Sequence, residues 1–294
     1  MFLILDQYKT DFCMQMQKAA EKLGLNSLLL TSVELVHDVK LQYRLSNNHT
    51  TGILTYNGTS YSIQDISGVY CAINSFPSGL WKHFSKADAQ YASREYHALW
   101  WCILHNMNCP VINPPVGDTL AGLKPSPTQL AFIAQKIGLK TPKIFYTKPI
   151  KSANFCSQTS SFAITDLSVP YESEFCQQAP GISKKIKNDV RMREIIEGDS
   201  VWIALIGTRP FAATIENQKR IIRFTQSKIP KKINERLQIL HQYLGLKLAE
   251  YHFIVTHEHQ WIIYSMMRQP QYVLRAFGEP IMNHILNQFT RKAA

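Results

Sequence analysis

Histidine and glutamate side chains gather in one short part of the sequence, where His252 is followed by "THEHQ" at 256–260. Imidazole nitrogens are common ligands of Zn²⁺ and Ni²⁺, so one hypothesis is a transition-metal site that uses His252, His257 and His259. The alternative is a polar turn between two strands, in which the two turn histidines need not converge. We prefer the turn, and the sequence predicts no metal site.

Cationic side chains form a second group that could bind a ligand. The formal net charge is +11, and the charge is concentrated in residues 183–193 and 218–236. Such runs favour anionic partners such as phosphates, acidic peptides or nucleic acid, although a solvated basic face has the same composition. The run at 183–193 lacks the interleaved aromatic residues of a base-stacking surface, so nucleic acid is not expected as a partner.

The stretch "WIIYSMMRQP" at 261–270 places two methionines at the end of an expected strand. Residues 261–264 are apolar, aromatic or β-branched and predict a buried strand, which Pro270 prevents from continuing. The carboxyl end of a strand often carries ligand-binding groups in α/β enzymes. Thioether sulfur is a poor ligand for Mg²⁺, so Met266 and Met267 are interpreted as packing residues.

Composition limits the class of protein. The 294 residues are 45% apolar, 11% aromatic and 18% charged, which is typical of a globular chain with two or three subdomains. No apolar run approaches the ~20 residues of a membrane-spanning helix, and the N-terminal segment reads as a strand rather than a signal peptide. Six cysteines without a C-x-x-C pair favour reduced, structural thiols and a cytoplasmic location.

The expected elements divide the chain into three regions. Residues 1–113 alternate strand and helix patterns, with a hairpin at Asn57-Gly58 and a long helix at about 87–107. On that helix Tyr91, Glu95, Leu99, Cys102, Ile103 and Asn106 are expected on one stripe, and of the pair Trp100 and Trp101 one is expected in the core and the other at its rim.

Residues 114–195 are expected to form a small lid. It starts with a helix capped by Ser126, Pro127 and Gln129, and its later part has one strand candidate at 161–165. Residues 196–294 are mostly β, with strands expected at 200–207, 209–217, 248–256 and 260–266, and another at 193–198 across the boundary. Helices are expected at 234–246 and about 278–291.

The order of these segments resembles an ATP-grasp protein, nearest to the branch of the ribosomal-protein S6 glutamate ligases and the microviridin-type peptide macrocyclases. The resemblance rests on Lys124 and on residues 129–143, 193–215 and 244–270, with "NPP" at 113–115 and the long helix bearing Glu95 as further matches. It implies an α/β (α+β), glutathione synthetase-like fold of three subdomains: an N-terminal α/β domain (1–113), a central lid (114–195) and a C-terminal antiparallel sheet (196–294).

An ATP-grasp site needs cations for the phosphates and hard oxygen ligands for Mg²⁺. By the resemblance, Lys124 matches the first lysine, and Lys184, Lys185, Arg191 and Arg193 are further candidates for anion binding. The other family positions fall on residues that cannot bind phosphate as a cation or Mg²⁺ as an anionic oxygen ligand. No Glu or Asp lies between Glu258 and Glu279 to replace them. These are Thr165 for the second lysine, Trp202 for an arginine, His252 for the magnesium aspartate, and Ser265 and Met267 for the final Glu-x-Asn.

The sequence therefore favours a degenerate ATP-grasp protein without Mg-ATP ligands, with no catalytic residues and no cofactor. It would act as a scaffold for a peptide or protein partner, with peptide modification as one setting, and could form a homodimer or a heterodimer with an active ligase. One alternative is an active ATP-dependent carboxylate–amine or carboxylate–hydroxyl ligase that forms an acyl-phosphate and uses ATP and Mg²⁺. A second alternative is a regulator that binds a nucleotide without Mg²⁺.

Overall fold

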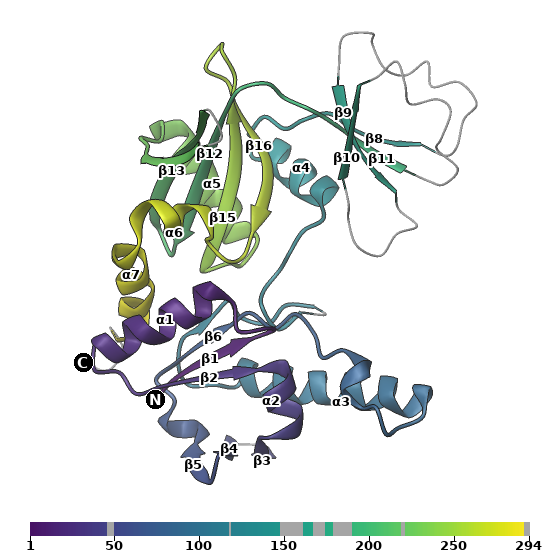
Figure 1. The fold of residues 1–294 in the computed structure, drawn as a ribbon, viewed down its shortest axis with the longest axis vertical. Coiled ribbons are helices and arrows are strands. Elements are labelled where there is room, and N and C mark those ends of the chain that lie inside the picture. The colour runs from purple at the N-terminus through teal and green to yellow at the C-terminus, as the bar shows by residue number, and fades with distance from the viewer. Residues whose placement is uncertain are drawn as a thin grey trace.

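The computed structural model of the chain describes residues 1–45, 50–117, 119–147, 161–166, 174–178, 190–218 and 221–290. These residues form four β-sheets with helices packed against them, which confirms the predicted α/β (α+β) class. In Figure 1 the sheet of the N-terminal residues lies below a larger antiparallel sheet, and a smaller sheet stands to one side. None of the described helices is long and apolar enough to cross a membrane.

The first sheet is parallel and has the order β2-β1-β6-β7. Every side chain of β1 is buried, as expected for a parallel strand that is covered on both faces. The chain passes from β1 to β2 on one side and later returns on the other side as β6, so the direction of winding reverses between β1 and β6. A reversal of this kind leaves a crevice at the carboxyl ends of the two strands. The strands are β1 (Phe2–Asp6), β2 (Ser27–Thr31), β6 (Gly68–Cys71) and β7 (Val111–Ile112).

Two helices cover the two faces of this sheet. Phe2 and Ile4 share a core with α1 (Asp11–Lys22), and Leu3 and Leu5 share another with α3 (Lys86–His105). A small antiparallel sheet of order β3-β4-β5 adjoins the second core, and its β4–β5 turn has positive φ at Asn57 and Gly58, which confirms the predicted hairpin. The remaining elements here are α2 (Ser32–His37), β3 (Lys40–Leu45), β4 (Thr50–Tyr56), β5 (Thr59–Ser62), η1 (Ile63–Asp65) and η2 (Ser78–Leu80).

The middle of the chain contributes α4 (Pro127–Lys136) and an antiparallel sheet of order β10-β9-β11-β8. The predicted capping box of α4 is confirmed, because the Ser126 hydroxyl accepts from the Gln129 amide and the Gln129 side chain accepts from the Ser126 amide. Pro127 stands at the first helical position, where its missing N–H costs nothing. The strands of this sheet are β8 (Ile144–Thr147), β9 (Ser161–Asp166), β10 (Glu174–Gln178) and β11 (Val190–Glu194).

The largest sheet is antiparallel and has the order β14-β13-β12-β15-β16. One face packs on α4 and α5 (Lys231–Tyr243), and the other packs on α6 (Tyr272–Phe277) and α7 (Glu279–Thr290). Helix α7 also contacts α1, so this face and the N-terminal sheet share one core (Figure 1). The strands are β12 (Asp199–Ile206), β13 (Arg209–Gln218), β14 (Ile221–Gln226), β15 (Leu248–Val255) and β16 (Trp261–Met267).

Some sequence-based expectations are wrong. The strand expected at 193–198 ends at Glu194 and belongs to β11, and the sequence did not predict β3, β10, β14, α2 or α6. The stripe expected on α3 is buried only in part, because Ile103 is buried beside Trp100 whereas Tyr91 is 65% exposed. Nine residues separate Tyr91 from Trp100, which is two and a half helical turns and puts them on opposite sides. The buried Trp100 and the half-buried Trp101 agree with the prediction for that pair.

Candidate functional site

A cavity of about 610 Å³ opens between the start of α4 and the end of β16. Lys124 and Ser126 border it on one side, and Ser265 and Met267 border it on the other, with Arg193 of β11 beside them. Its described lining contains two cations, Lys124 and Arg193, and no carboxylate. The chemistry of this lining favours an anionic group.

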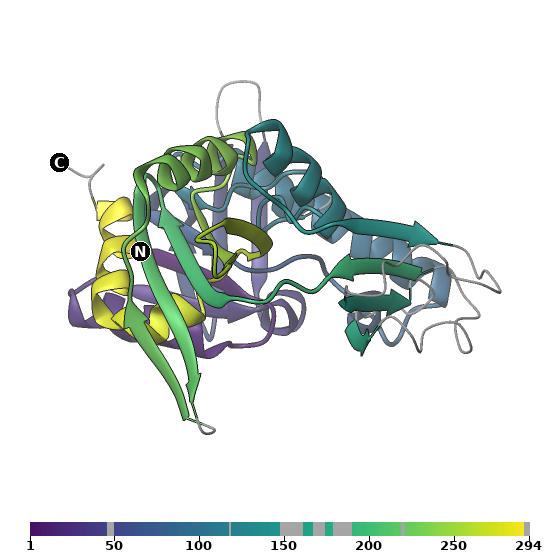
Figure 2. The same cartoon turned by 90° about the horizontal axis from the view of Figure 1, so that it is seen from above.

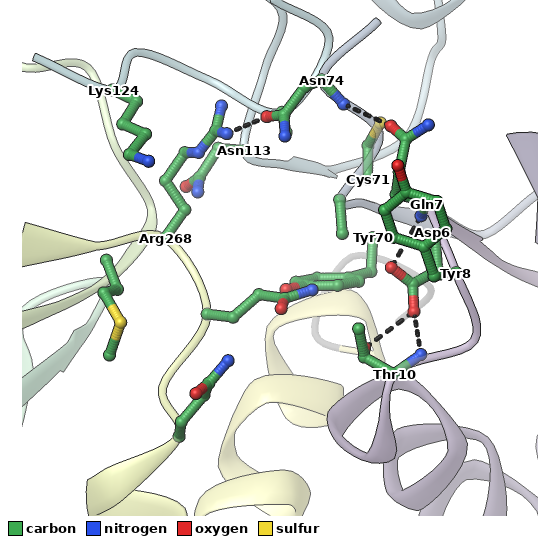
Figure 3. Close-up of a pocket in the computed structure, with 15 residues that line it drawn as sticks. Asp6, Gln7, Tyr8, Thr10, Tyr70, Cys71, Asn74, Asn113, Lys124 and Arg268 are labelled. Atoms are coloured by element: carbon green, nitrogen blue, oxygen red, sulfur yellow. Dashed lines mark hydrogen bonds between the residues drawn. The ribbon is translucent and has the colours of Figure 1, made fainter. Parts of the chain in front are cut away.

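A second cavity, of about 280 Å³, occupies the crevice at the carboxyl ends of β1 and β6. Figure 3 shows Lys124, Asn113 and Arg268 entering it from one side, and Asp6, Tyr8 and Thr10 from the opposite side. The two cavities share Lys124 and Met267, so they form one continuous depression between the N-terminal sheet and the C-terminal sheet, which we call the interlobe cleft. Lys124 and Met267 could be identified from the sequence, but the crevice could not, because the order of the strands decides where the crevice lies.

Three of the positions that the resemblance assigns to ligands lie in one row across the C-terminal sheet. In the strand register Trp202 of β12 is opposite His252 of β15, and His252 is opposite Ser265 of β16. The Trp202 ring stacks on the His252 ring with centroids 4.2 Å apart, and on the Tyr272 ring at 4.1 Å on its other face. Aromatic packing therefore fills the space above this row.

The His252 imidazole is built into this packing as a neutral ring. Its Nε2 lies 2.8 Å from the Ser200 hydroxyl, and the side chain is largely enclosed. Burial, and to a smaller extent the charge of Arg193, lowers the pKa of His252 to about 4. A neutral imidazole between aromatic rings supplies no negative charge to a divalent cation, and a nitrogen ligand suits Mg²⁺ poorly.

Arg193 is held at the edge of the same row by Tyr264. The guanidinium lies 3.8 Å from the Tyr264 ring centroid, and its Nη1 donates to the Tyr264 carbonyl at 3.0 Å. Tyr264 occupies this place because the β15–β16 pairing is irregular between His252 and Phe253, where Phe253 is opposite Ile263 and His252 is opposite Ser265. Such a bulge re-aims one side chain, and a single sequence gives no signal for it.

Asp6, which lines the smaller cavity, and Glu250, which bonds to the lining residue Gln271, are both engaged with the backbone. Glu250, which the sequence analysis did not single out, is fully buried on β15 and accepts from the amides of Gln271, Tyr272 and Val273 at 3.0, 3.3 and 2.6 Å. Burial raises the pKa of Glu250 to about 7, against the effect of these three bonds. Asp6 accepts from the Gln7 amide and from the amide and hydroxyl of Thr10, as Figure 3 shows.

The other predicted site residues lie elsewhere or outside the described residues. Thr165 of β9 is opposite Arg191 of β11, and the Arg191 guanidinium donates to the Thr165 hydroxyl at 3.2 Å. Both side chains are buried in the small sheet, and neither lines the cavities described here. Lys184 and Lys185 lie outside the described residues. The anion-binding roles of these residues, and the assignment of family positions to Thr165, Trp202, His252, Ser265 and Met267, stay predictions.

Other candidate chemistry finds no support in the described part of the chain. No group of three His, Cys, Asp or Glu side chains there could hold a metal ion, and "THEHQ" forms a turn closed by the Thr256 amide and the Gln260 carbonyl. Burial raises the pKa of Cys71 to about 12 and that of Cys109 to about 11, so these thiols are poor nucleophiles at neutral pH.

The fold can be compared with known proteins. No protein-family model and no curated protein sequence matches the chain. Its structure is similar to that of the macrocyclase MdnC bound with precursor peptide MdnA from Microcystis aeruginosa MRC, with a TM-score of 0.78, 16% identity and 99% of each chain covered.

Two further structures extend this comparison. The RiPP-associated ATP-grasp ligase of Chryseobacterium gregarium, in complex with ADP and a leader and core peptide, has a TM-score of 0.74 and 16% identity, covering 100% of this chain and 97% of that one. The D-alanine–D-alanine ligase of Bacillus anthracis, complexed with ATP, has a TM-score of 0.56 and 9% identity, with 99% and 97% covered. The chain therefore has the ATP-grasp fold.

Proposed function

We propose that this protein binds a peptide in its interlobe cleft and does not carry out magnesium-dependent ligase chemistry. The observation that carries the proposal is the row of Trp202, His252 and Ser265, which the strand register aligns and in which no side chain is a hard anionic ligand. The nearest acidic groups do not replace one, because Glu250 and Asp6 accept hydrogen bonds from backbone amides. Mg²⁺ holds a triphosphate through carboxylates and water, so the described residues of the cleft do not fit Mg-ATP.

A peptide partner is supported by the neighbours and by the lining of the cleft. Two of the similar ligases are described in complex with a precursor, leader or core peptide. In this chain the cleft combines the exposed Lys124 with the side chains of Gln271, Tyr8 and Met267, which offer a cation, an amide, a phenol and an apolar surface. Such a lining suits a peptide with mixed side chains. A cytoplasmic location and a dimer, with itself or with an active ligase, are parts of the same proposal.

An anion that binds without magnesium is a second candidate function. It is favoured by one observation, the presence of Lys124 and Arg193 in the larger cavity without a lining carboxylate. A nucleotide phosphate or another anion would find cations there but no metal site. An active ligase would instead need oxygen ligands for Mg²⁺ from residues outside the described ranges.

Thermal unfolding with nucleotide separates these functions. The protein is heated in buffer, with ATP, and with ATP and MgCl₂, and a ligand at 100 times its dissociation constant stabilises it by about 2.7 kcal/mol. We expect the same unfolding temperature in buffer, with ATP, and with ATP and MgCl₂. A shift that requires Mg²⁺ would overturn the proposal in favour of a ligase, and an equal shift with ATP alone would favour the anion-binding regulator.

The peptide half of the proposal is tested with a displayed library of random short peptides. We expect the wild-type protein to enrich peptides that a Ser265→Trp variant binds much more weakly, because the indole occupies part of the larger cavity. Gln260→Trp, at the other end of β16 and exposed, is the matched control and should bind the enriched peptides normally. If the enriched peptides bind Ser265→Trp as tightly as they bind the wild type, the cleft is not the peptide site.

A further inference from the structure

A cavity of about 530 Å³ lies on a part of the C-terminal sheet that does not border the interlobe cleft. It is lined by the start of β13, the end of β14, the start of α5 and the end of α6, and it shares no lining residue with the cleft. We call it the β13–β14 pocket. Figure 2 shows the β13–β14 hairpin as two long green strands that run beside the yellow C-terminal helices.

The floor of this pocket is aromatic and its rim is cationic. Phe211 and Phe277 meet edge to face with ring centroids 5.4 Å apart, and Phe211 is only 6% exposed. The Arg209 guanidinium lies 5.0 Å from the Phe211 ring centroid, and Lys231, at the start of α5, also lines the pocket. No described lining residue is acidic, and the ion pair of Lys231 with Glu235 spans 3.9 Å between exposed side chains, so it is weak and a carboxylate of a ligand can compete for Lys231.

The surrounding sequence has the same sign of charge. Residues 207–236 contain two acidic residues, Glu216 and Glu235, against eight basic ones. Arg275 of α6 adds a guanidinium over the Phe224 ring of β14, at 5.8 Å from its centroid. Of the basic residues, Arg209 and Lys231 line the pocket itself, and positive charge at a recess raises the local concentration of anionic ligands. The eight basic residues are Arg209, Lys219, Arg220, Arg223, Lys228, Lys231, Lys232 and Arg236.

The pocket also lies beside an open sheet edge. β14 is the outermost strand of its sheet, and Arg223, Thr225 and Gln226 are exposed along it. An outer strand can pair with an added extended peptide, with backbone hydrogen bonds for affinity and side-chain pockets for specificity. Phe211 is buried and Phe277 is half-buried, so the recess can receive one apolar side chain but presents no row of exposed aromatic faces on which nucleic-acid bases could stack in series.

We infer that the β13–β14 pocket docks an extended acidic peptide segment of a partner protein. One apolar side chain of the segment enters the recess over Phe211 and Phe277, and carboxylates on either side of it meet Arg209 and Lys231. This docking surface is separate from the interlobe cleft, so it does not depend on the function proposed for the cleft. A chain that binds through both places holds one partner at two points, and each point raises the effective concentration at the other.

Fluorescence anisotropy with a labelled synthetic peptide tests the inference. The probe alternates Glu and Asp around one central Phe, and a second probe has Lys in place of every acidic residue. We expect the acidic probe to bind at low salt and the lysine probe not to bind. Arg209→Glu combined with Lys231→Glu should weaken binding of the acidic probe about tenfold. Lys18→Glu combined with Lys86→Glu, which changes the net charge equally on exposed residues of α1 and α3, should leave it unchanged.

A charge-neutral variant separates the pocket from the general field of the basic face. Gln226→Trp should place an indole in part of the recess and weaken binding, whereas Thr225→Trp, which is exposed on the other face of β14, should not. Circular dichroism and thermal unfolding confirm that each variant is folded. The inference would be overturned if both charge-reversal pairs weakened binding of the acidic probe equally. It would also be overturned if the lysine probe bound, or if Gln226→Trp bound the acidic probe as tightly as the wild type. Binding of single-stranded RNA with the same dependence on Arg209 and Lys231 would also overturn it and would assign the surface to nucleic acid.

Discussion

Buried ionisable side chains of β15 and α5 have shifted pKa values with opposite effects on the pH dependence of stability. Burial lowers the pKa of His241 and of His252 to about 4, so both are neutral in the folded protein at pH 7. The unfolded chain takes up protons on both as the pH falls below about 6.5, so these two residues remove stability between about pH 6.5 and 4. Glu250 acts in the opposite direction, because its pKa is raised to about 7. As the pH rises, Glu250 loses its proton in the unfolded chain before it does so in the folded protein. The contribution of Glu250 to stability is therefore lost between about pH 4.5 and 7.

Replacing Glu250 with glutamine isolates its contribution. Glu250→Gln keeps an acceptor oxygen for the Val273 amide but cannot ionise, so it should gain stability relative to the wild type as the pH rises. A pKa raised from 4.5 to about 7 corresponds to a difference of about 3 kcal/mol between pH 4.5 and pH values above 7. Urea unfolding of both proteins at pH 5 and pH 7.5 measures this difference, and the histidine contribution cancels in the comparison.

The control for this measurement is Glu258→Gln, in the exposed turn before β16. The hydrogen bond from Thr256 lowers the pKa of Glu258, so this carboxyl is ionised in both states across the window and its replacement should add no pH dependence. If the difference in unfolding free energy between Glu250→Gln and the wild type does not change with pH, Glu250 is ionised in the folded protein over the whole range. Its three backbone hydrogen bonds would then outweigh the effect of burial.

At the scale of elements, the capping box of α4 fixes one wall of the larger cavity. The Ser126 hydroxyl accepts from the Gln129 amide at 3.2 Å, which satisfies one of the free amides at the helix start. Ser126→Ala should destabilise the protein by about 1 kcal/mol, and Ser126→Gly by only a few tenths. Ser85→Ala removes the equivalent bond to the Asp88 amide at the start of α3, so it should cost as much in chemical denaturation. A cost for Ser126→Ala well below that of Ser85→Ala would mean that the start of α4 is held by its neighbours instead.

Elements with local signals could be predicted from the sequence, and elements fixed by distant partners could not. The α4 cap and the Asn57-Gly58 turn depend on residues only a few positions apart, so the local sequence is enough to predict them. β14 lies in a basic run and becomes a strand by pairing with β13. α6 has no side-chain cap of its own and begins at amides that donate to Glu250, over twenty residues earlier in the chain.

The candidate site could likewise be predicted only where local sequence signals define it. Element order and resemblance indicated which residues of β12, β15 and β16 to compare, and the register aligns Trp202, His252 and Ser265. The stacking of Tyr272 on Trp202 comes from α6, which the sequence analysis did not find. The smaller cavity depends on the strand order of the N-terminal sheet, which is set by packing across many residues rather than by any motif.

In the whole molecule, the width of the cleft depends on how the N-terminal sheet joins the C-terminal sheet. Asn113 follows β7 and is buried against β15, where its side chain bonds to both backbone groups of Leu248 and to the Lys247 amide. Gly122 leaves room for this side chain, because a Cβ there would lie 2.5 Å from that of Asn113. Arg268, just after β16, donates to the Thr119 hydroxyl and the Gly122 carbonyl at 2.8 Å and also contacts Asn74.

Asn113→Ala tests whether this side chain couples the two sheets. The substitution leaves two amides and one carbonyl at the start of β15 without their partner, and unsatisfied buried groups cost about 1–3 kcal/mol. Asn106→Ala is the matched control, since that exposed side chain bonds only to Cys102 within the end of α3. We expect Asn113→Ala to lower the urea midpoint much more than Asn106→Ala, and to speed hydrogen exchange at the amides of Lys247 and Leu248 while β12 stays protected. Equal midpoints for the two variants would mean that Arg268 and the shared apolar core hold the lobes together without Asn113.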